Sequence, residues 1–246
     1  MSALSRLTLT ETKLFFREPV GVFFMLGFPP ILLVILGSIP SFREVDAELG
    51  GLRVIDLYAP IIVAMTLAFL ALSGLPQLLA TYREKGVLRR MRTTPVKPVR
   101  LLGAQLLMFT AIAVLVMVVV QAVASLAFDV EVPQQPAAYA LGYVLAALSM
   151  LALGLLIAAL APSGKGASAI GTLLFFPVLF FAGLWAPRAT MPEVLRRISD
   201  FTPLGAGVQS LQDATAGHWP QLLHLAVMLG WTVVAGGLAA RYFRWE

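Results

Sequence analysis

Three observations on this sequence predict an all-α membrane protein with six transmembrane helices. Of its 246 residues, 59% are hydrophobic and only 13% are charged, against about 25% charged in ordinary globular proteins. Six separate stretches contain no Asp, Glu, Lys or Arg and approach the roughly 20 residues that a helix needs to cross a bilayer. These stretches also lack the two-residue alternation of a β-barrel, which is the other structure that can satisfy its backbone in lipid.

The predicted spans are residues 20–37, 58–80, 101–128, 138–160, 168–186 and 222–240. The longest segment between them, residues 187–221, is too short and too rich in Pro and Gly to build a soluble core. We therefore expect residues 20–246 to form one six-span transmembrane domain, preceded by a separate N-terminal segment.

That N-terminal segment, residues 1–19, is predicted to be an amphipathic helix on the inner leaflet. Leu4, Leu7, Leu14 and Phe15 lie within one arc of the helix, with Arg6, Lys13 and Arg17 on the opposite side. Such a distribution is typical of a helix that lies in the membrane interface. Glu11 falls within the apolar arc, so its carboxylate either contacts a soluble partner or reaches past the apolar side chains to water.

The distribution of basic residues predicts that both termini are cytoplasmic. In this orientation 13 of the 18 Lys and Arg residues lie on the cytoplasmic side and five lie outside, as the positive-inside rule requires. The net charge of +5 then reflects attraction to the anionic inner leaflet, and no nucleic-acid partner is needed to explain it. We expect a multi-pass protein of the cytoplasmic membrane that contacts membrane lipids.

The loop after the second predicted span has the features of a docking surface. Val87, Leu88 and Met91 share one face of a helix, and Lys85, Arg89 and Arg92 share the opposite face. Glu84 lies on the apolar face, and its neighbour at i+4 is Leu88 rather than a basic residue, so no helical ion pair satisfies it. An acid within an apolar stripe that faces the cytoplasm indicates a surface for a soluble partner. The alternative is a solvated basic loop.

Between the fifth and sixth predicted spans we expect two short helices. Thr190 and Glu193 have the spacing of a capping box at the start of the first, and apolar residues follow at helical spacing. The second helix, at about 205–215, is expected to end at Gly217. Pro177, within the fifth span, is the favoured hinge beside this segment because proline removes a helical hydrogen bond.

Three groups of short motifs occur in order along the chain. They are Arg17-Glu18-Pro19; Arg83-Glu84-Lys85-Gly86-Val87-Leu88 through Thr94-Pro95-Val96; and Phe176-Pro177, Phe181-Ala182-Gly183, Ala186-Pro187, Met191-Pro192, Phe201-Thr202-Pro203-Leu204 and Ala216-Gly217. In this order they resemble the connecting helix, the coupling helix, and the fifth span with its external loop in ABC-2 type permeases. These permeases are the membrane subunits of type-2 ABC exporters, and the resemblance covers most of the chain.

The resemblance implies roles for particular residues. It assigns contact with a separate ABC ATPase subunit to Arg83, Glu84, Lys85, Gly86, Val87, Leu88 and Met91. Glu11, from its place in the apolar arc, is a second candidate contact. It assigns the two short helices, as re-entrant helices of the outer leaflet, to an external gate that includes Pro177, Gly183, Pro187, Pro192, Pro203 and Leu204. The alternative is a surface cap that does not gate.

Aromatic residues of the second and fifth spans are candidate walls for a substrate path. They are Phe69, Phe175, Phe176, Phe180 and Phe181. Large apolar side chains of this kind can bind a drug-like or lipid-like molecule. The alternative is that these rings face membrane lipid.

No residue pattern in the chain indicates catalysis. Its only Gly-Lys pair, Gly164-Lys165, is followed by Gly166 rather than by the Ser or Thr of a P-loop. Two histidines and no cysteine provide no set of metal ligands. We therefore expect no enzyme activity, metal or cofactor in this chain, and we expect ATP and Mg²⁺ on the partner ATPase.

Together these expectations describe the permease subunit of an ATP-driven exporter. We favour a homodimer over a pair with a sister permease. The expected substrate is a small amphipathic drug, antibiotic or lipid-like compound that leaves across the cytoplasmic membrane. Two alternatives are an ATP-independent facilitator or channel and a membrane assembly scaffold.

Overall fold

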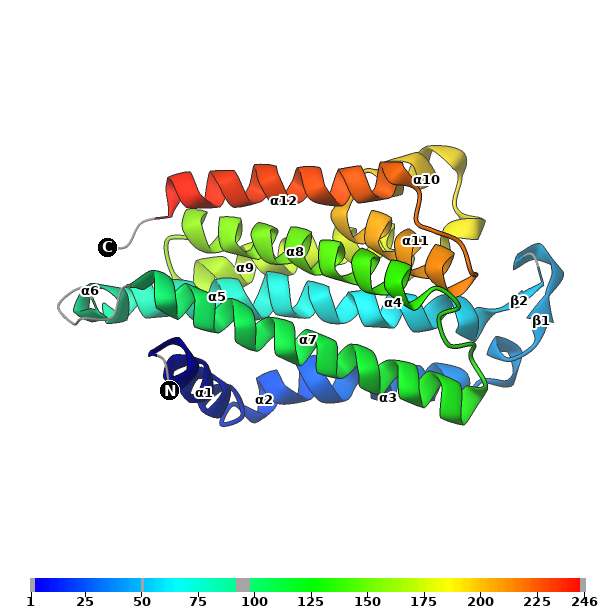
Figure 1. Cartoon of the computed structure of the whole chain (residues 1–246), viewed down its shortest axis with the longest axis horizontal. Coiled ribbons are helices and arrows are strands. Elements are labelled where there is room, and N and C mark those ends of the chain that lie inside the picture. Colours follow the sequence, from blue (N-terminus) through cyan, green and yellow to red (C-terminus); the bar gives the residue numbers. More distant parts are fainter. Residues whose placement is uncertain (1–2, 50, 92–97, 244–246) are drawn as a thin grey trace.

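The computed structural model describes residues 3–49, 51–91 and 98–243. The described chain is an elongated bundle whose long helices run roughly along its long axis (Figure 1). Helices α1 (Ala3–Phe15) and α6 (Val87–Met91) lie at one end, which we name the α6 end. Strands β1 (Val45–Asp46) and β2 (Leu52–Arg53) form an antiparallel hairpin at the other, which we name the hairpin end.

Six helical segments within the described residues are long and apolar enough to cross a membrane. They are α2 (Pro19–Val22) continued by η1 (Phe23–Gly27) and α3 (Phe28–Gly37), α4 (Val54–Ala68) continued by η4 (Phe69–Gly74) and α5 (Leu75–Glu84), α7 (Pro98–Phe128), α8 (Pro136–Leu160), α9 (Gly164–Phe181), and α12 (Leu222–Tyr242). The prediction of an all-α membrane protein with six spans is confirmed.

The fifth span begins and ends earlier than the predicted range 168–186. Its first turn is capped by Ser163, whose hydroxyl accepts a hydrogen bond from the Gly166 N–H at 3.1 Å. The helix ends before Gly183, whose φ of +92° is left-handed and is typical of the residue that follows a helix. The predicted residues after Gly183 therefore lie in the following loop.

The second span contains a π-helical segment, η4, directly before Pro76. Because Pro76 has no N–H, it cannot bond to the carbonyl of Leu72 four residues earlier. Gly171 of α9 approaches that carbonyl so closely that a Cβ would overlap it, and Gly154 of α8 approaches the Ala71 carbonyl in the same way. The fourth and fifth spans therefore pack directly on the π-helical part of the second, as small residues allow in membrane bundles.

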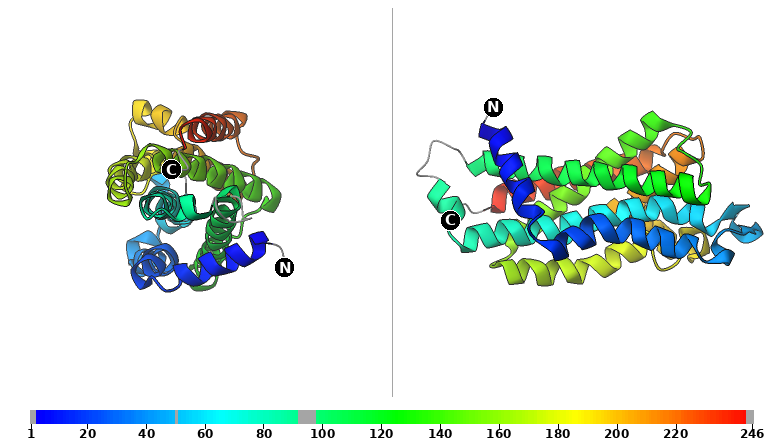
Figure 2. Two further views of the ribbon diagram at one scale, coloured as in Figure 1. Left: turned by 90° about the vertical axis from the view of Figure 1, so that its left-hand side faces the viewer. Right: turned by 90° about the horizontal axis from the view of Figure 1, so that it is seen from below.

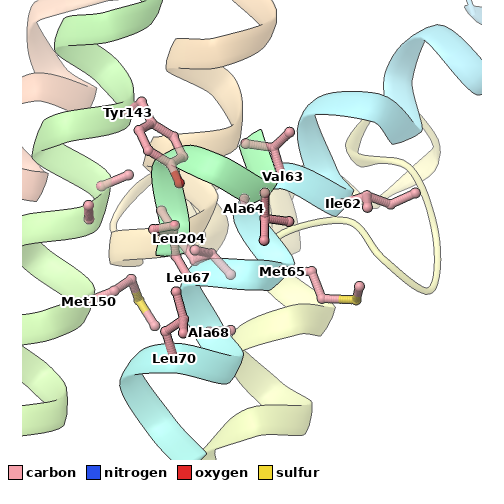
Figure 3. Close-up of a cluster of buried hydrophobic side chains, with 14 of the residues drawn as sticks. Ile62, Val63, Ala64, Met65, Leu67, Ala68, Leu70, Tyr143, Met150 and Leu204 are labelled. Carbon is pink, nitrogen blue, oxygen red and sulfur yellow. The ribbon is translucent and has the colours of Figure 1, made fainter. Parts of the chain in front are cut away.

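The second span is the centre of the core. Of its most apolar window 78% is buried, against 22% for each of the first, fifth and sixth spans. Apolar side chains of α4 pack against Tyr143 and Met150 of α8 and against Leu204 of α11 (Pro203–Thr215) (Figure 3). The outer spans thus keep one face free for lipid or for another chain.

Helix α1 lies across the α6 end of the bundle at a steep angle to the long helices (Figure 2). The segments outside the spans at the hairpin end are η2 (Pro40–Phe42), η3 (Ala47–Leu49), η5 (Arg188–Thr190), α10 (Glu193–Asp200) and α11. The predicted pair of short helices is present as α10 and α11, whereas the β1–β2 hairpin was not predicted.

The predicted capping box at α10 is wrong. The Thr190 hydroxyl donates to the Pro187 carbonyl at 2.8 Å, and Glu193 instead pairs with Arg197 one turn later. Helix α11 has the cap that α10 lacks, because the Thr202 hydroxyl accepts a hydrogen bond from the Gly205 N–H at 3.1 Å.

Candidate functional site

At the α6 end, Arg83 and Glu84 belong to the last turn of α5 and not to the short helix α6. Gly86, with a φ of +68°, separates the two helices. The Arg83 guanidinium donates to the carbonyl of Ala158 at 3.2 Å and to that of Ala161. A cation in this position satisfies the carbonyls at the C-terminal end of α8.

Glu84 also contacts its own chain. Its carboxylate accepts a hydrogen bond from the Gly164 N–H at 3.1 Å, at the first residue of α9. A negative charge is favourable at a helix N-terminus. The sequence offers Glu84 no helical ion pair, and the structure gives it a backbone partner on a distant helix instead. Its side chain remains exposed to solvent.

The helix α6 itself has one buried and one exposed side. Leu88 is buried and Val87 is half-buried, while Arg89 is exposed, as is Lys85 just before the helix. Met91 is the last residue of the helix, and the rest of the predicted basic face, at Arg92, lies outside the described residues. The surface that α6 presents to solvent is therefore basic.

Glu11 does not face a soluble partner, and that expectation is corrected. It is 6% exposed, and its carboxylate accepts hydrogen bonds from the Tyr82 hydroxyl at 2.9 Å and from the Gln105 Nε2 at 2.6 Å. Burial raises the pKa of the Glu11 carboxyl, and the two hydrogen bonds lower it in part. The apolar arc that contains Glu11 packs on the bundle, which the helical pattern alone could not distinguish from packing on a partner.

The position of these two donors gives Glu11 a structural role. Tyr82 lies in α5 just before α6, and Gln105 lies in the first turns of α7, which follows α6 along the chain. Through one carboxylate, α1 is therefore bonded to both helices that connect to α6. A displacement of α6 that moves either connection also strains the position of α1.

The candidate aromatic residues lie on the second and fifth spans and form two groups of contacting rings. The rings of Phe69 and Phe175 are 4.6 Å apart between centroids, and Phe175 contacts Phe176 at 6.0 Å. Phe176 is 55% exposed and stacks on Trp185 at 6.4 Å. Phe180 and Phe181 contact each other further along α9 at 5.4 Å.

Residues of the first span extend this series and were missed from the sequence. Phe24 and Phe28 lie 6.3 and 6.2 Å from Phe69 between ring centroids. Both follow helical spacing in an apolar run, which is also typical of residues that face lipid, so the pattern gave no signal for them. The three spans together present one aromatic face.

The six candidate gate residues occupy different environments. Leu204 and Pro203 are buried at the start of α11, and Gly183 is buried after α9. Pro187 is half-buried, whereas Pro177 and Pro192 are exposed. Leu204 is fully enclosed within the core beside α4 and α8 (Figure 3). The start of α11 is therefore fixed in the bundle.

The hairpin end also holds a group of polar side chains that the sequence did not predict, and we name it the charge cluster: Arg188, Asp200 and His224. Asp200 of α10 accepts hydrogen bonds from the Arg188 guanidinium and from His224 Nε2, the latter at 3.2 Å. Arg188 also donates to the Gln209 side chain of α11 at 3.2 Å. These residues are spread over more than 30 positions, so their spacing along the chain gave no motif.

Within the described residues no group of three or more His, Cys, Asp or Glu side chains is placed to hold a metal ion. A family model described as ABC-2 type transporter matches residues 2–215, which is most of the chain. No curated protein matches the chain. The family match includes α1, α6, the first five spans and both short helices, so the chain belongs to the ABC-2 type transporter family and is a transmembrane permease of an ABC transporter.

Proposed function

We propose that this permease is one membrane half of an ATP-driven exporter that carries a small amphipathic drug, antibiotic or lipid-like compound out across the cytoplasmic membrane. The single observation that supports this best is the aromatic face on the first, second and fifth spans, which includes the exposed ring of Phe176. Amphipathic molecules bind well to such apolar, aromatic walls.

A separate ABC ATPase supplies the energy in this proposal, with ATP and Mg²⁺ bound to that subunit. The cytoplasmic side is the α6 end, where α1 begins, where α12 ends and where Lys85 and, on α6, Arg89 are exposed. The ATPase docks on this basic surface, and its closure on ATP displaces α6. Because Glu11 bonds α1 to both helices beside α6, the displacement is passed to α1 and to the second and third spans.

A second copy of the chain completes the path. The first and fifth spans expose most of their surface, and their aromatic rings continue from one span to the other through Phe69. A second copy placed on this face encloses the rings between two second spans, since homo-oligomers commonly use such two-fold contacts. The substrate path then lies between the copies, because the second and fifth spans of one copy leave no room between them.

The experiment that tests this proposal is purification of the tagged chain from its native membrane in a mild detergent. We expect an ABC ATPase in equimolar amount with the chain. Arg89→Glu reverses a charge on the exposed face of α6 and should abolish co-purification of the ATPase. Arg197→Glu, on the exposed face of α10, should leave the ATPase bound. Flux of a substrate through liposomes that contain this chain alone would instead establish a facilitator, and neither ATPase nor flux would favour an assembly scaffold.

A further inference from the structure

A crevice of about 340 Å³ lies between α7 and α8, beside the loop that joins them at the hairpin end (Figure 1). It exists because these two consecutive helices pack mainly on other elements, α7 on α1, α3 and α4, and α8 on α11 and α12. Its volume lies within the roughly 300–1,000 Å³ of small-molecule sites. Neither helix contributes to the aromatic face, so the crevice is separate from the proposed substrate path.

The inner part of the crevice is apolar and lies at membrane depth. It is lined by Met117 and Val118 of α7 and by Tyr139 and Ala140 of α8. Val118 is 54% exposed, and Leu126, further along α7, is 87% exposed. Because both helices are membrane spans, such exposed side chains contact the hydrocarbon of the bilayer and not water. The molecule that meets this lining is therefore a lipid acyl chain.

Two polar side chains line the crevice nearer to the hairpin end. The Gln121 Nε2 donates to the Glu131 carbonyl at 3.4 Å, which is long for an N–H···O bond. The Ser125 hydroxyl donates to the Ala122 carbonyl of its own helix at 3.3 Å. Among the described residues the second N–H of Gln121 has no partner, and an unpaired amide is costly where water is scarce. A ligand with a carbonyl oxygen at this depth satisfies it.

The rim of the crevice is acidic. It is formed by the loop 129–135, which carries Asp129 and Glu131 and contains no Lys or Arg. The Arg53 guanidinium reaches the Asp129 carbonyl at 2.9 Å, but it is already paired with Asp56 at 2.7 Å. The negative charge at the rim therefore attracts a cationic group and repels an anionic one.

We propose that the crevice binds one phospholipid of the leaflet at the hairpin end, with an acyl chain between α7 and α8, an ester carbonyl at Gln121 and an ethanolamine ammonium group at Glu131. The Glu131 carboxylate is exposed and accepts a hydrogen bond from the Gln134 Nε2 at 3.0 Å through one oxygen, which leaves the other for the ligand. An ethanolamine ammonium group has N–H donors for this oxygen, whereas the quaternary amine of choline has none.

A lipid in this position fills the space between the third and fourth spans, which otherwise pack on different neighbours. In the orientation proposed above, the lipid belongs to the outer leaflet, and that detail rests on the proposed function. Its binding does not, because it requires neither an ATPase nor a transported substrate. Loss of ATPase co-purification would thus refute the exporter and leave the lipid site standing.

The test uses the full chain in nanodiscs of phosphatidylcholine. A phosphatidylethanolamine probe with a diazirine on one acyl chain is added and activated by light, and the labelled peptides are identified by mass spectrometry. We expect the label to concentrate on residues 117–125 and 132–140. Added phosphatidylethanolamine should reduce this labelling about two- to fivefold more than equal phosphatidylcholine or phosphatidylglycerol, the ratio expected for one exposed charge contact.

Two substitutions test the lining of the crevice. Ala140→Trp places a large side chain in it from an exposed position of α8 and should reduce the labelling severalfold. The matched control Ala111→Trp, at an exposed position of α7 outside the crevice, should label as the natural chain does. Gln121→Leu keeps an apolar side chain of similar size without the donor, and it should reduce labelling about two- to tenfold, as expected for one hydrogen bond.

A third substitution tests the headgroup. Glu131→Gln should abolish the preference for phosphatidylethanolamine over phosphatidylcholine, whereas Glu44→Gln, which removes an exposed acid of the same end outside the crevice, should retain it. Three results overturn the proposal: labelling spread evenly over the exposed faces of all six spans, equal labelling of Ala140→Trp and the natural chain, or cross-links from this segment to a second copy of the chain in place of lipid. Equal competition by the three lipids overturns the ethanolamine assignment.

Discussion

At the α6 end of the bundle, charged side chains are satisfied by neutral groups, whereas at the hairpin end charges meet one another directly. Glu11 bonds to a phenol and an amide, and Arg83 and Glu84 bond to backbone groups of α8 and α9. Asp200, in contrast, lies between Arg188 and His224. At the α6 end, a change in the charge of one side chain therefore affects only the hydrogen bonds of that side chain. At the hairpin end, a change in the charge of Asp200 affects Arg188 and His224 together.

The two ends are therefore expected to respond differently to substitution of a carboxylate. A carboxylate with neutral donors can be replaced by an amide that accepts the same hydrogen bonds, and the geometry is retained. A carboxylate shared between two basic groups cannot, because the charge balance of both is lost with it. Substituting residues of each kind and measuring the loss in free energy of unfolding compares the two ends.

The largest effect is expected for Asp200→Ala. The substitution leaves Arg188, with a side chain 28% exposed, and His224, 2% exposed, without their acceptor. We expect the free energy of unfolding to fall by about 2–4 kcal/mol, somewhat less than the ~3–5 kcal/mol for a fully buried ion pair, because both side chains are partly exposed. Thermal unfolding of the purified chain measures it. Asp200→Asn keeps an acceptor and should lose less, and a loss below about 0.5 kcal/mol for Asp200→Ala would contradict a structural role for the charge cluster.

Glu11→Ala is expected to cost somewhat less, about 1–3 kcal/mol, because two neutral donors lose their acceptor. Tyr82 and Gln105 would then have no bond to α1. The readouts are thermal unfolding and the rate of limited proteolysis within α1. Equal protease resistance of Glu11→Ala and the natural chain would show that α1 is held by its apolar contacts alone.

Glu11→Gln sharpens the comparison through pH. Burial raises the pKa of Glu11, so the folded chain binds this proton more tightly than the unfolded chain does. The contribution of a protonated Glu11 to stability is therefore present at low pH and is lost as the pH rises through the raised pKa. Glu11→Gln stays neutral, so it should unfold at a higher temperature than the natural chain at pH ~8 and at a similar temperature at pH ~4.5. If Glu11→Gln and the natural chain unfold at equal temperatures at both pH values, burial does not raise the pKa of Glu11.

The fold could be predicted from the sequence because its strongest determinant is local. Uninterrupted apolar runs give spans of fixed minimum length in any membrane, whatever packs beside them. The C-terminal end of α11 was also predictable from Gly217. Its φ of +85° is one that glycine readily adopts, so a glycine here marks the end of the helix. The fifth span was displaced because a single side chain, Ser163, begins the helix earlier than hydropathy indicates.

The contacts of the candidate site were less predictable because they join residues far apart in the chain. Glu11 was identified from the sequence as an acid on an apolar helix face, but its partner Gln105 lies 94 residues away. Glu84 was placed on one helix face with Val87 and Leu88, whereas it ends α5, before α6 begins, and bonds to Gly164, 80 residues away. A helical pattern shows that a face is covered and does not show by what. The charge cluster was missed for the same reason, since His224 lies two residues inside an otherwise uncharged span.

Two helix caps allow a matched test of both ends. Ser163 caps α9 at the α6 end, and Thr202 caps α11 at the hairpin end, each through one hydrogen bond of 3.1 Å. Ser163→Ala and Thr202→Ala should each cost about 1 kcal/mol in thermal unfolding. A much larger cost at Thr202 would indicate that opening of the hairpin end limits the stability of the whole bundle, and a larger cost at Ser163 would indicate the reverse.

The smallest effect is expected for Glu193→Ala, which removes the other ion pair of α10. Its partner is Arg197, and the two side chains are 65% and 75% exposed, so water and salt screen their attraction. We expect a loss of no more than about 0.5 kcal/mol at physiological salt. Glu193 and Asp200 lie at opposite ends of the same short helix. Comparing the losses in free energy of unfolding for their alanine variants therefore separates the effect of burial from that of charge. A Glu193→Ala chain as unstable as Asp200→Ala would mean that α10 itself, rather than the charge cluster, holds the hairpin end together.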